Sequence, residues 1–357
     1  MKKDKILFIF SRYHMDPKNI HHKCGTGVAQ LEILGTLENL GYDVYFGGQE
    51  DFFYPKEYIT ESKAIIYIAP AFPKFIKYRP TAKLILFANN SHVLVRNQRM
   101  RDSAKKWALD AESLGQEKFF LPAYKYSDFI LVAGNKQVFN TFTKNGVPEE
   151  KLQYWHNSVN ASIYKPGKEK YKDFTFVHWS SEVGLRKGLP AILAAWKKWN
   201  HPKARLIIMG ILTKDGKKLL YKRNWFGWPK LALPKNVVFY GSKRGFPSQD
   251  PYVLEVLSKS HVGIFPTLED NQPAAAMEMA ASGLPLIITE ESGFELNPSW
   301  CYKVTMDDVD SLTESLNVAY LDPNLEQKGK NAREFMIKNH NWDDFRKQFA
   351  QFIKSVL

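Results

Sequence analysis

Short apolar segments alternate with longer amphipathic segments along the whole chain. The first series of short segments predicts strands at Ile6–Phe10, Asp43–Phe46, Ala64–Ile68, Lys83–Phe87, Phe129–Val132 and Leu152–Trp155. A second series predicts strands at Phe174–His178, Ala204–Met209, Val237–Tyr240, Val262–Phe265 and Pro285–Thr289. Apolar residues at helical spacing predict helices between them, such as Val28–Leu40, Gln137–Lys144, Leu189–Trp199, Tyr252–Lys259 and Met277–Ser282. This alternation is typical of parallel sheets with helices on both faces, so the pattern predicts an α/β protein.

A polar, lysine-rich segment, Tyr164–Lys172, separates the two series of strands. With 357 residues, the chain is too long for one ordinary hydrophobic core. We therefore predict two Rossmann-like domains, at residues 1–165 and 166–335.

The last segment, residues 336–357, has its own pattern. Phe345, Phe349 and Phe352 recur there at helical spacing. We expect a closing helix, and one hypothesis is that it packs back on the N-terminal domain.

The charge balance narrows the choice of partners. Apolar residues make up 44% of the chain, and its formal net charge is +13. Such a charge favours nucleic acid, an anionic membrane surface or phosphorylated substrates, or it is only a solvated basic surface. Basic residues are densest in Lys74–Lys106 and in Lys214–Lys230, where they alternate with aromatic residues as at a lipid headgroup layer. No recognition-helix pattern or RNA-binding signature accompanies them, so we predict no nucleic-acid partner.

Cysteine usage and hydropathy indicate the compartment. Cys24 and Cys301 are the only cysteines, which argues against a disulfide framework and a cysteine-based zinc site. No apolar stretch approaches the roughly 20 residues that span a bilayer, and nothing resembles a signal peptide. We predict a cytoplasmic protein, with peripheral binding to the cytoplasmic face of a membrane as an option for its basic segments.

The strongest local signal begins where the predicted strand Val262–Phe265 ends. In an open α/β sheet, ligands bind beyond the carboxyl ends of the strands. Pro273 is predicted near a helix start, with Asp270 or Asn271 as the cap. The free amides of the first turn, from Ala274 onward, would face the crevice and stabilise a diphosphate together with the helix dipole.

Two carboxylates flank this helix start. Asp270 and Glu278 are separated by seven residues, a spacing that places both around one pocket. Glu278 is near enough to bond hydroxyl groups of a ribose or a sugar, and the small Ala274 and Ala275 leave room for close approach. Taken alone, such a pair of carboxylates is more often a helix cap and a surface group than a binding site. The surrounding sequence therefore decides between the two interpretations.

That context is a resemblance to a known family. The segment from Glu269 to Pro285, Glu-Asp-Asn-Gln-Pro-x3-Met-Glu-Met-Ala-x-Ser-Gly-Leu-Pro, resembles the donor motif of the retaining glycosyltransferases of the large GT4 family. Gly25-Thr26-Gly27 before a predicted helix, the segment Asn157–Pro166 between the domains, and Leu185–Leu189 agree with the family in order and spacing. The resemblance implies a GT-B fold, in which two Rossmann-like domains face a central cleft. It also implies a UDP- or GDP-sugar as co-substrate, with no cofactor and no metal required.

The same resemblance assigns roles to individual residues. Lys187 would bind the diphosphate of the donor and act in catalysis, and Glu278 would hold the donor ribose. Asp270 stands where the family usually has glutamate and would contact the transferred sugar. Most members place an arginine five residues before the lysine, but this chain has Glu182 there, so the adjacent Arg186 is expected to substitute as a fork-shaped donor.

The family's glycine-rich segment is replaced here by Asn271-Gln272-Pro273, which has less freedom to approach phosphate. The complete predicted set of donor-binding residues is Arg186, Lys187, Glu269, Asp270, Asn271, Gln272, Pro273, Ala274, Ala275 and Glu278.

The N-terminal domain is expected to bind the acceptor. Gly25-Thr26-Gly27 predicts a loop whose backbone a ligand can approach closely. His92 follows the fourth predicted strand, at about the place of a family histidine near the reacting centre, although an isolated loop histidine is as often without function. His14 lies in the long loop after the first strand and is assigned to the acceptor pocket. No partner carboxylate accompanies it, so we predict no metal site.

The function predicted from these features is transfer of a sugar, with retention of its anomeric configuration, from a nucleotide diphospho-sugar to a glycan, glycolipid or lipid-linked acceptor. One alternative is an inverting transferase or a sugar-nucleotide epimerase of the same fold, which the anomer of the product would distinguish. Another alternative is a non-catalytic protein that binds sugar-nucleotide or an anionic polymer. Tight binding without release of sugar would identify that second alternative.

Overall fold

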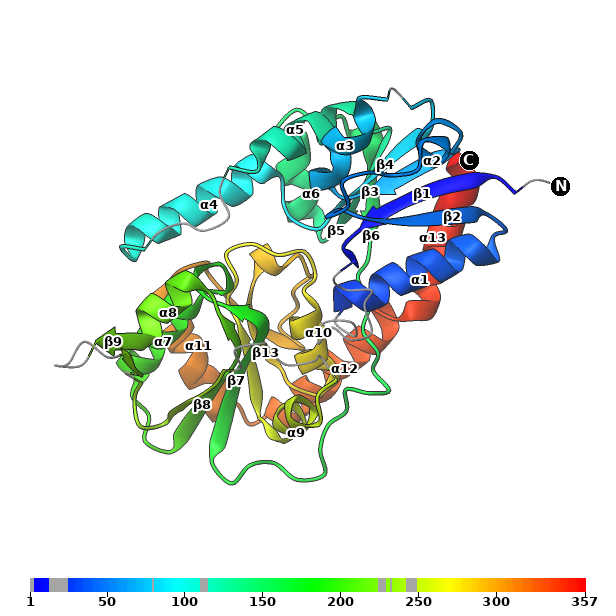
Figure 1. Ribbon diagram of the computed structural model, residues 1–357. Coiled ribbons are helices and arrows are strands. Elements are labelled where there is room, and N and C mark those ends of the chain that lie inside the picture. Colours follow the sequence, from blue (N-terminus) through cyan, green and yellow to red (C-terminus); the bar gives the residue numbers. More distant parts are fainter. Residues whose placement is uncertain are drawn as a thin grey trace.

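The computed structural model describes residues 3–12, 25–78, 80–109, 115–223, 229–231, 233–241 and 249–357. These residues form two α/β domains, each built on a parallel sheet of six strands (Figure 1).

The N-terminal sheet has the strand order β2-β1-β3-β4-β5-β6. Its strands are β1 (Lys5–Phe10), β2 (Asp43–Gly48), β3 (Ala64–Tyr67), β4 (Lys83–Ala88), β5 (Phe129–Ala133) and β6 (Leu152–Trp155). The central strands are apolar and buried along nearly their whole length, because helices cover both faces of the sheet.

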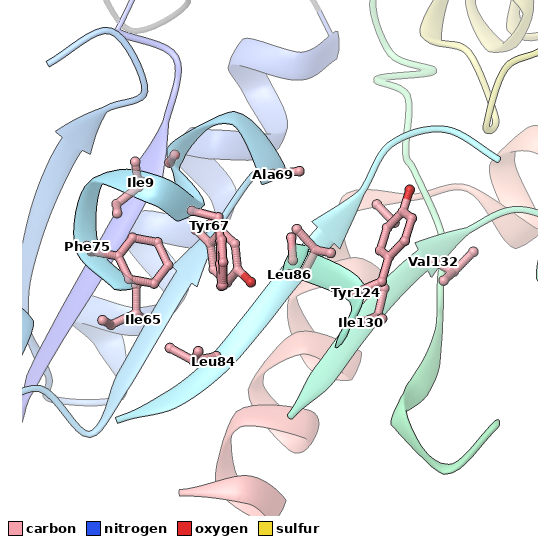
Figure 2. Packing of buried hydrophobic residues seen from close by; sticks show 14 of the residues in the cluster. Ile9, Ile65, Tyr67, Ala69, Phe75, Leu84, Leu86, Tyr124, Ile130 and Val132 are labelled. Carbon is pink, nitrogen blue, oxygen red and sulfur yellow. The ribbon is translucent and has the colours of Figure 1, made fainter. Parts of the chain in front are cut away.

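Short helices pack on one face of this sheet. They are α2 (Lys56–Thr60), η2 (Ala69–Ala71), α3 (Phe72–Ile76), α5 (Glu117–Tyr126) and α6 (Lys136–Thr143), with η3 (Glu149–Lys151) before β6. Figure 2 shows the core between them, where Tyr67 and Phe75 meet edge to face with ring centroids 4.9 Å apart. Helix α4 (Val93–Lys106) leaves this layer and extends along the C-terminal domain (Figure 1).

The opposite face of the N-terminal sheet is covered by α1 (Gly25–Asn39) and α13 (Trp342–Val356). In α13, Phe345, Phe349 and Ile353 are buried against the sheet, and the rings of Phe345 and Trp155 lie 4.5 Å apart. The last helix of the chain therefore completes the core of the first domain.

The C-terminal sheet has the order β11-β8-β7-β12-β13-β14. Its strands are β7 (Phe174–Val183), β8 (Ala204–Leu212), β11 (Val237–Tyr240), β12 (Val262–Phe265), β13 (Leu286–Thr289) and β14 (Cys301–Val304). Helices α7 (Leu189–Trp199) and α11 (Val309–Leu321) cover one face, and α9 (Pro251–Lys259), α10 (Ala274–Ala281) and α12 (Leu325–Asn339) cover the other. Beside β8, α8 (Lys214–Leu220) leads into a two-stranded antiparallel pair, β9 (Tyr221–Arg223) and β10 (Pro229–Leu231).

The chain crosses between the domains twice, after β6 and again before α13, and the two crossings are bonded to each other. The Val159 amide donates to the carbonyl oxygen of His340 at 2.9 Å, and the Ser158 hydroxyl donates to that of Asn341 at 3.0 Å. The hinge between the domains is thus a paired crossing rather than a single linker.

The strands and helices predicted from hydrophobic periodicity are all present, with ends shifted by a few residues. Strand β14 was missed because its apolar run is short and Lys303 interrupts it; the strand lies at the edge of the sheet, where an exposed lysine is tolerated. The prediction of a loop at Gly25–Gly27 is wrong, because these residues form the first turn of α1.

Among the described residues, no helix combines the length with the apolar composition that a membrane crossing requires. Part of the basic and aromatic segment Lys214–Lys230, residues 224–228, lies outside the described residues.

Candidate active site

A cavity of about 590 Å³ lies between the two domains and is lined by both. Phe10, Phe87 and Trp155 reach it from the carboxyl ends of β1, β4 and β6, and Trp179 reaches it from β7. The carboxyl ends of parallel strands are where α/β sheets bind ligands, because the strand order leaves a crevice there.

A buried ion pair forms the polar centre of the cavity. Lys187, in the single turn η4 (Leu185–Lys187) after β7, forms a salt bridge with Asp270, in the loop after β12. Its ammonium group also lies over the Phe265 ring, 5.1 Å from the centroid. The Arg186 guanidinium lies 3.6 Å from the Asp270 carboxylate and 3.7 Å from Glu182 at the rim. Two cations thus converge on one buried carboxylate.

Gly188 allows the turn that carries Lys187 to come close to the segment that carries Asp270. Gly188 follows Lys187 directly and has a φ of 76°, which a residue with a side chain rarely adopts. A Cβ at this position would lie 2.2 Å from the carbonyl oxygen of Pro266. Only glycine therefore lets the turn carrying Lys187 pack against the segment carrying Asp270.

The pKa shifts in the cluster follow from burial and from the two cations. Burial, and then the charge of Arg186, lowers the pKa of Lys187, which the Asp270 carboxylate opposes. Burial acts to raise the pKa of Asp270, but the charges of Lys187 and Arg186 outweigh it and lower that pKa. With Asp270 ionised, these three groups carry one net positive charge and are suited to receive an anion.

Helix α10 directs its N-terminus at the same cavity. The cap residue is Pro273, no side chain caps the helix, and Ala274 and Ala275 line the cavity. The prediction that Asp270 or Asn271 caps α10 is wrong, because Asp270 is held by Lys187 and the side-chain amide of Asn271 donates to the Ala88 carbonyl oxygen at 3.3 Å. The uncapped N-terminus adds amide dipoles to the positive side of the cavity.

The loop before α10 is held from two sides. Gln272 has a φ of 50°, in the left-handed region that disfavours residues with a side chain. Its amide donates to the Ser292 carbonyl oxygen at 2.7 Å, and its side-chain oxygen accepts from the Asn157 amide at 2.9 Å. The side-chain amide of Asn157 also donates to the backbone carbonyl oxygen of Asn271 at 2.9 Å. These bonds hold a conformation that the loop sequence alone disfavours.

Glu278 lies one turn into α10 and lines the cavity. The Trp179 indole donates to its Oε2 at 2.6 Å. Burial raises the pKa of Glu278 to about 7, while hydrogen bonds from Trp179 and Tyr164 act in the opposite direction. Near neutral pH this carboxyl group therefore exchanges between its neutral and charged forms.

Glu269 does not line the cavity, although it was predicted to bind the donor. It is fully buried behind Asp270, and its Oε1 accepts from the Ser91 amide of the N-terminal domain at 2.9 Å. Burial raises the pKa of its carboxyl group. Its contacts make Glu269 a link between the domains rather than a ligand-facing residue.

His92, predicted near the reacting centre, lies inside the N-terminal domain instead. It caps α4 by accepting from the Leu94 amide, and its ring packs against Tyr124 and Phe142. Burial lowers its pKa to about 4. The side chain turns inward because the chain enters α4 here, and Asn89, directly after β4, lines the cavity in its place.

Of the residues predicted for the acceptor side, Thr26 lines the cavity from the first turn of α1. His14 lies outside the described residues.

Three residues that the sequence analysis missed belong to this site: Asn89, Asn157 and Trp179. Asn89 had a readable signal, since it follows a buried strand directly. Trp179 had none, because it reads as part of a buried apolar strand.

Comparison with known proteins identifies the family of the C-terminal domain. Residues 174–322 match the family model described as glycosyl transferases group 1. This match places the C-terminal domain in the glycosyl transferases group 1 family. The chain is 21% identical over 318 residues to the phosphatidylinositol N-acetylglucosaminyltransferase gpi3 subunit of Schizosaccharomyces pombe, a match that covers 82% of this chain and 67% of that protein.

Solved structures agree on the fold. Sucrose-phosphate synthase from Thermosynechococcus elongatus superposes with a TM-score of 0.72 at 14% identity and 99% coverage of both chains. Anabaena HepE in complex with UDP and glucose gives 0.70 at 14% identity, covering 99% of this chain and 100% of that one. WaaG, a glycosyltransferase of lipopolysaccharide biosynthesis, gives 0.60 at 15% identity, with 98% and 99% covered. The protein has the GT-B fold and is a glycosyltransferase of the hexosyltransferase class, which transfers a sugar from a nucleotide-sugar.

The raised pKa of Glu278 predicts a cost to stability that depends on pH. Its ordinary value is 4.5, and in the folded protein it is about 7, so the folded state binds this proton more tightly than the unfolded state. Its contribution to the free energy of unfolding therefore falls as pH rises from about 4.5 through about 7. Glu278→Gln should be more stable than the unsubstituted protein at pH 8, with a smaller difference at pH 5.

Urea unfolding at both pH values measures this difference. Glu150→Gln, an exchange at an exposed glutamate, is the control and should leave the free energy of unfolding unchanged. A Glu278→Gln protein whose advantage does not grow between pH 5 and pH 8 would contradict the assignment.

Proposed function

We propose that the protein is a retaining glycosyltransferase that takes a sugar from a UDP- or GDP-sugar and gives it to a hydroxyl group of a glycan or lipid-linked acceptor. The observation that carries this proposal is the convergence of Lys187, Arg186 and the uncapped N-terminus of α10 on one interdomain cavity.

The diphosphate of the donor is proposed to bind at this convergence. When the glycosidic bond breaks, negative charge grows on the departing diphosphate, and cations with fixed amide dipoles stabilise it most where water is excluded. Lys187 and Arg186 are held in place by Asp270 before any ligand arrives, so little reorganisation is needed. We propose that these two cations and the amides supply this stabilisation without a metal ion.

Asp270 and Glu278 are proposed to bind the two ends of the donor. A diphosphate on Lys187 competes with Asp270 for the ammonium group, which leaves carboxylate oxygens of Asp270 to accept from hydroxyl groups of the transferred sugar. Glu278, on the next turn of α10, accepts from the ribose. The shorter side chain of Asp270, compared with the family's usual glutamate, leaves more space on the sugar side.

Retention of the anomeric configuration is what the resemblance to the family implies. The geometry supports it, since the cavity-lining carboxylates of the described residues, Glu182, Asp270 and Glu278, are each bonded to a cation or an indole. None of the three is placed as an unengaged nucleophile or base of the kind that glycosidases use.

UDP is the first nucleotide to test, because HepE, which shares the fold, was solved with UDP and glucose. For the acceptor, the gpi3 subunit is by name a phosphatidylinositol N-acetylglucosaminyltransferase, which supports a lipid-linked acceptor. We propose the N-terminal side of the cavity, near Thr26 and Asn89, as the acceptor side.

A lipid-linked acceptor fits a protein that binds an anionic membrane surface. Phe52 and Phe53 are 88% and 79% exposed in the N-terminal domain. Lys74 of α3 bonds the backbone carbonyl oxygen of Asp51 at 2.7 Å, so the segment that carries these rings lies against a lysine of α3. Aromatic side chains next to lysine are suited to a headgroup layer, where the ring inserts and the cation meets lipid phosphate. We propose this patch, Phe52, Phe53 and Lys74, as the membrane contact.

Lys187→Ala tests the diphosphate site. Hydrogen bonds to charged groups contribute about 1.5–3 kcal/mol, so affinity for UDP should fall roughly tenfold to a hundredfold. Calorimetric titration with UDP measures this, with Lys198→Ala, an exposed lysine paired with Asp310, as the control. Unchanged affinity in a folded Lys187→Ala protein would remove this residue from the site.

The stereochemical proposal has its own test. In D2O, glucose released by slow hydrolysis of UDP-glucose should appear first as the α-anomer, because the donor is α-linked and retention preserves that configuration. Proton NMR at times short compared with mutarotation measures the ratio of anomers. Early appearance of the β-anomer would indicate an inverting enzyme.

The membrane proposal predicts binding to vesicles that contain phosphatidylglycerol and much weaker binding to vesicles of phosphatidylcholine alone, with binding lost at high salt. Replacing both Phe52 and Phe53 by alanine should weaken the binding. Leu321→Ala, an exchange at an exposed apolar side chain of α11 in the other domain, should not. Co-sedimentation with vesicles gives the bound fraction, and equal binding by all three proteins would exclude this patch.

A further inference from the structure

The indole of Trp179 holds the carboxyl group of Glu278 inside the cavity. Trp179 and Glu278 are both almost fully buried, and both line the cavity. The indole N–H donates to Oε2 at a distance of 2.6 Å, which is short for an N–H donor. The indole of Trp179, which can donate one hydrogen bond and accept none, thus points at the carboxyl group of Glu278, which can accept that bond.

The backbone explains why the indole reaches this position. β7 pairs with β8 in regular register up to Trp179, and the register shifts between Trp179 and Glu182. Such an irregularity re-aims the side chains of a strand, and irregularities of this kind are common beside active sites. The strand that carries Trp179 also leads to the turn with Lys187, so both are placed by one segment.

The bond restricts what the carboxyl group can offer to a ligand. Tyr164 also bonds the Glu278 side chain, so two donors fix its rotamer from the protein side. These two bonds use part of the acceptor capacity of the carboxyl group, and the remaining lone pairs are available to a ligand that enters the cavity. A donated hydrogen bond also favours the ionised carboxylate, which is the form that accepts from hydroxyl groups.

We propose that Trp179 is a positioning residue for the donor ribose: by fixing the Glu278 carboxylate through its indole N–H, it sets the acceptor geometry for the ribose hydroxyl groups. This inference rests on the proposed function, in which Glu278 binds the ribose of a nucleotide-sugar. Trp179 acts through Glu278, and its own ring contributes packing to the surrounding core.

A purely structural tryptophan would behave differently, and a thermodynamic cycle separates the two roles. Removing the N–H by Trp179→Phe should weaken binding of UDP. It should not weaken binding of 2′,3′-dideoxy-UDP, which lacks the ribose hydroxyl groups whose hydrogen bonds Glu278 would accept. A loss of packing alone would weaken both ligands by the same factor.

The experiment is calorimetric titration of both ligands into the full-length protein at pH 7. For Trp179→Phe we expect the Kd for UDP to rise about tenfold, with the Kd for 2′,3′-dideoxy-UDP within about twofold of the unsubstituted protein. The control is Trp196→Phe, another buried tryptophan, whose indole donates to Asn236 at 3.2 Å on the other face of the sheet. It should change neither Kd.

Each other outcome overturns the inference in a recognisable way. Equal losses for the two ligands, or no loss for either, in a protein that binds UDP would reject the positioning role and leave the proposed function intact. If the unsubstituted protein binds neither UDP nor GDP, the proposed function fails and this inference fails with it. Should Trp179→Phe not fold, Trp179→Met serves in its place, because its flexible apolar side chain fills part of the space and carries no hydrogen-bond donor.

Discussion

The salt bridge between Lys187 and Asp270 is the interaction on which the site depends. It joins the turn after β7 to the loop after β12, two segments that lie 83 positions apart in sequence. Both groups are buried, and removing one partner from such a pair leaves an uncompensated charge in a medium of low polarity. Because Arg186 adds a second cation, the cluster attracts an anion even while Asp270 is present.

The two domains together determine the shape of the loop before α10. The side chain of Asn271 donates to the last residue of β4, and Glu269 accepts from the turn that follows β4. From the crossing between the domains, Asn157 donates to the backbone of Asn271. Behind the loop, Met100 and Ala104 of α4 pack against Leu185 and Leu268 in a small apolar cluster. Leu185 precedes Arg186 and Lys187, and Leu268 precedes Glu269 and Asp270. A movement of the N-terminal domain would therefore displace the cations and carboxylates of the cavity directly.

Two of the sequence-based expectations failed for one reason. His92 was predicted from its position after the fourth strand and from the resemblance, and Glu269 from the family motif. Such signals indicate which end of the sheet a residue occupies. The direction of the side chain is a separate matter, and neither residue lines the cavity because neighbours in the fold hold each side chain elsewhere. The Leu94 amide and two aromatic rings contact His92, and the Ser91 amide bonds Glu269. The capping assignment of Asp270 failed likewise, since a nearby cation binds a carboxylate more strongly than helix amides do.

The sequence alone determined the α/β class, the two series of strands and the segments that surround the cavity. These follow from local periodicity, which depends on residues close in the chain. The motif also predicted Lys187, Asp270 and Glu278 as site residues, and all three line the cavity, because a motif preserves the spacing of residues along one strand, loop and helix. Only the tertiary structure brought Trp179 to Glu278 and Asn157 to the loop before α10. Such contacts join segments distant in the chain, so they depend on how the two sheets pack, which no short stretch of sequence encodes.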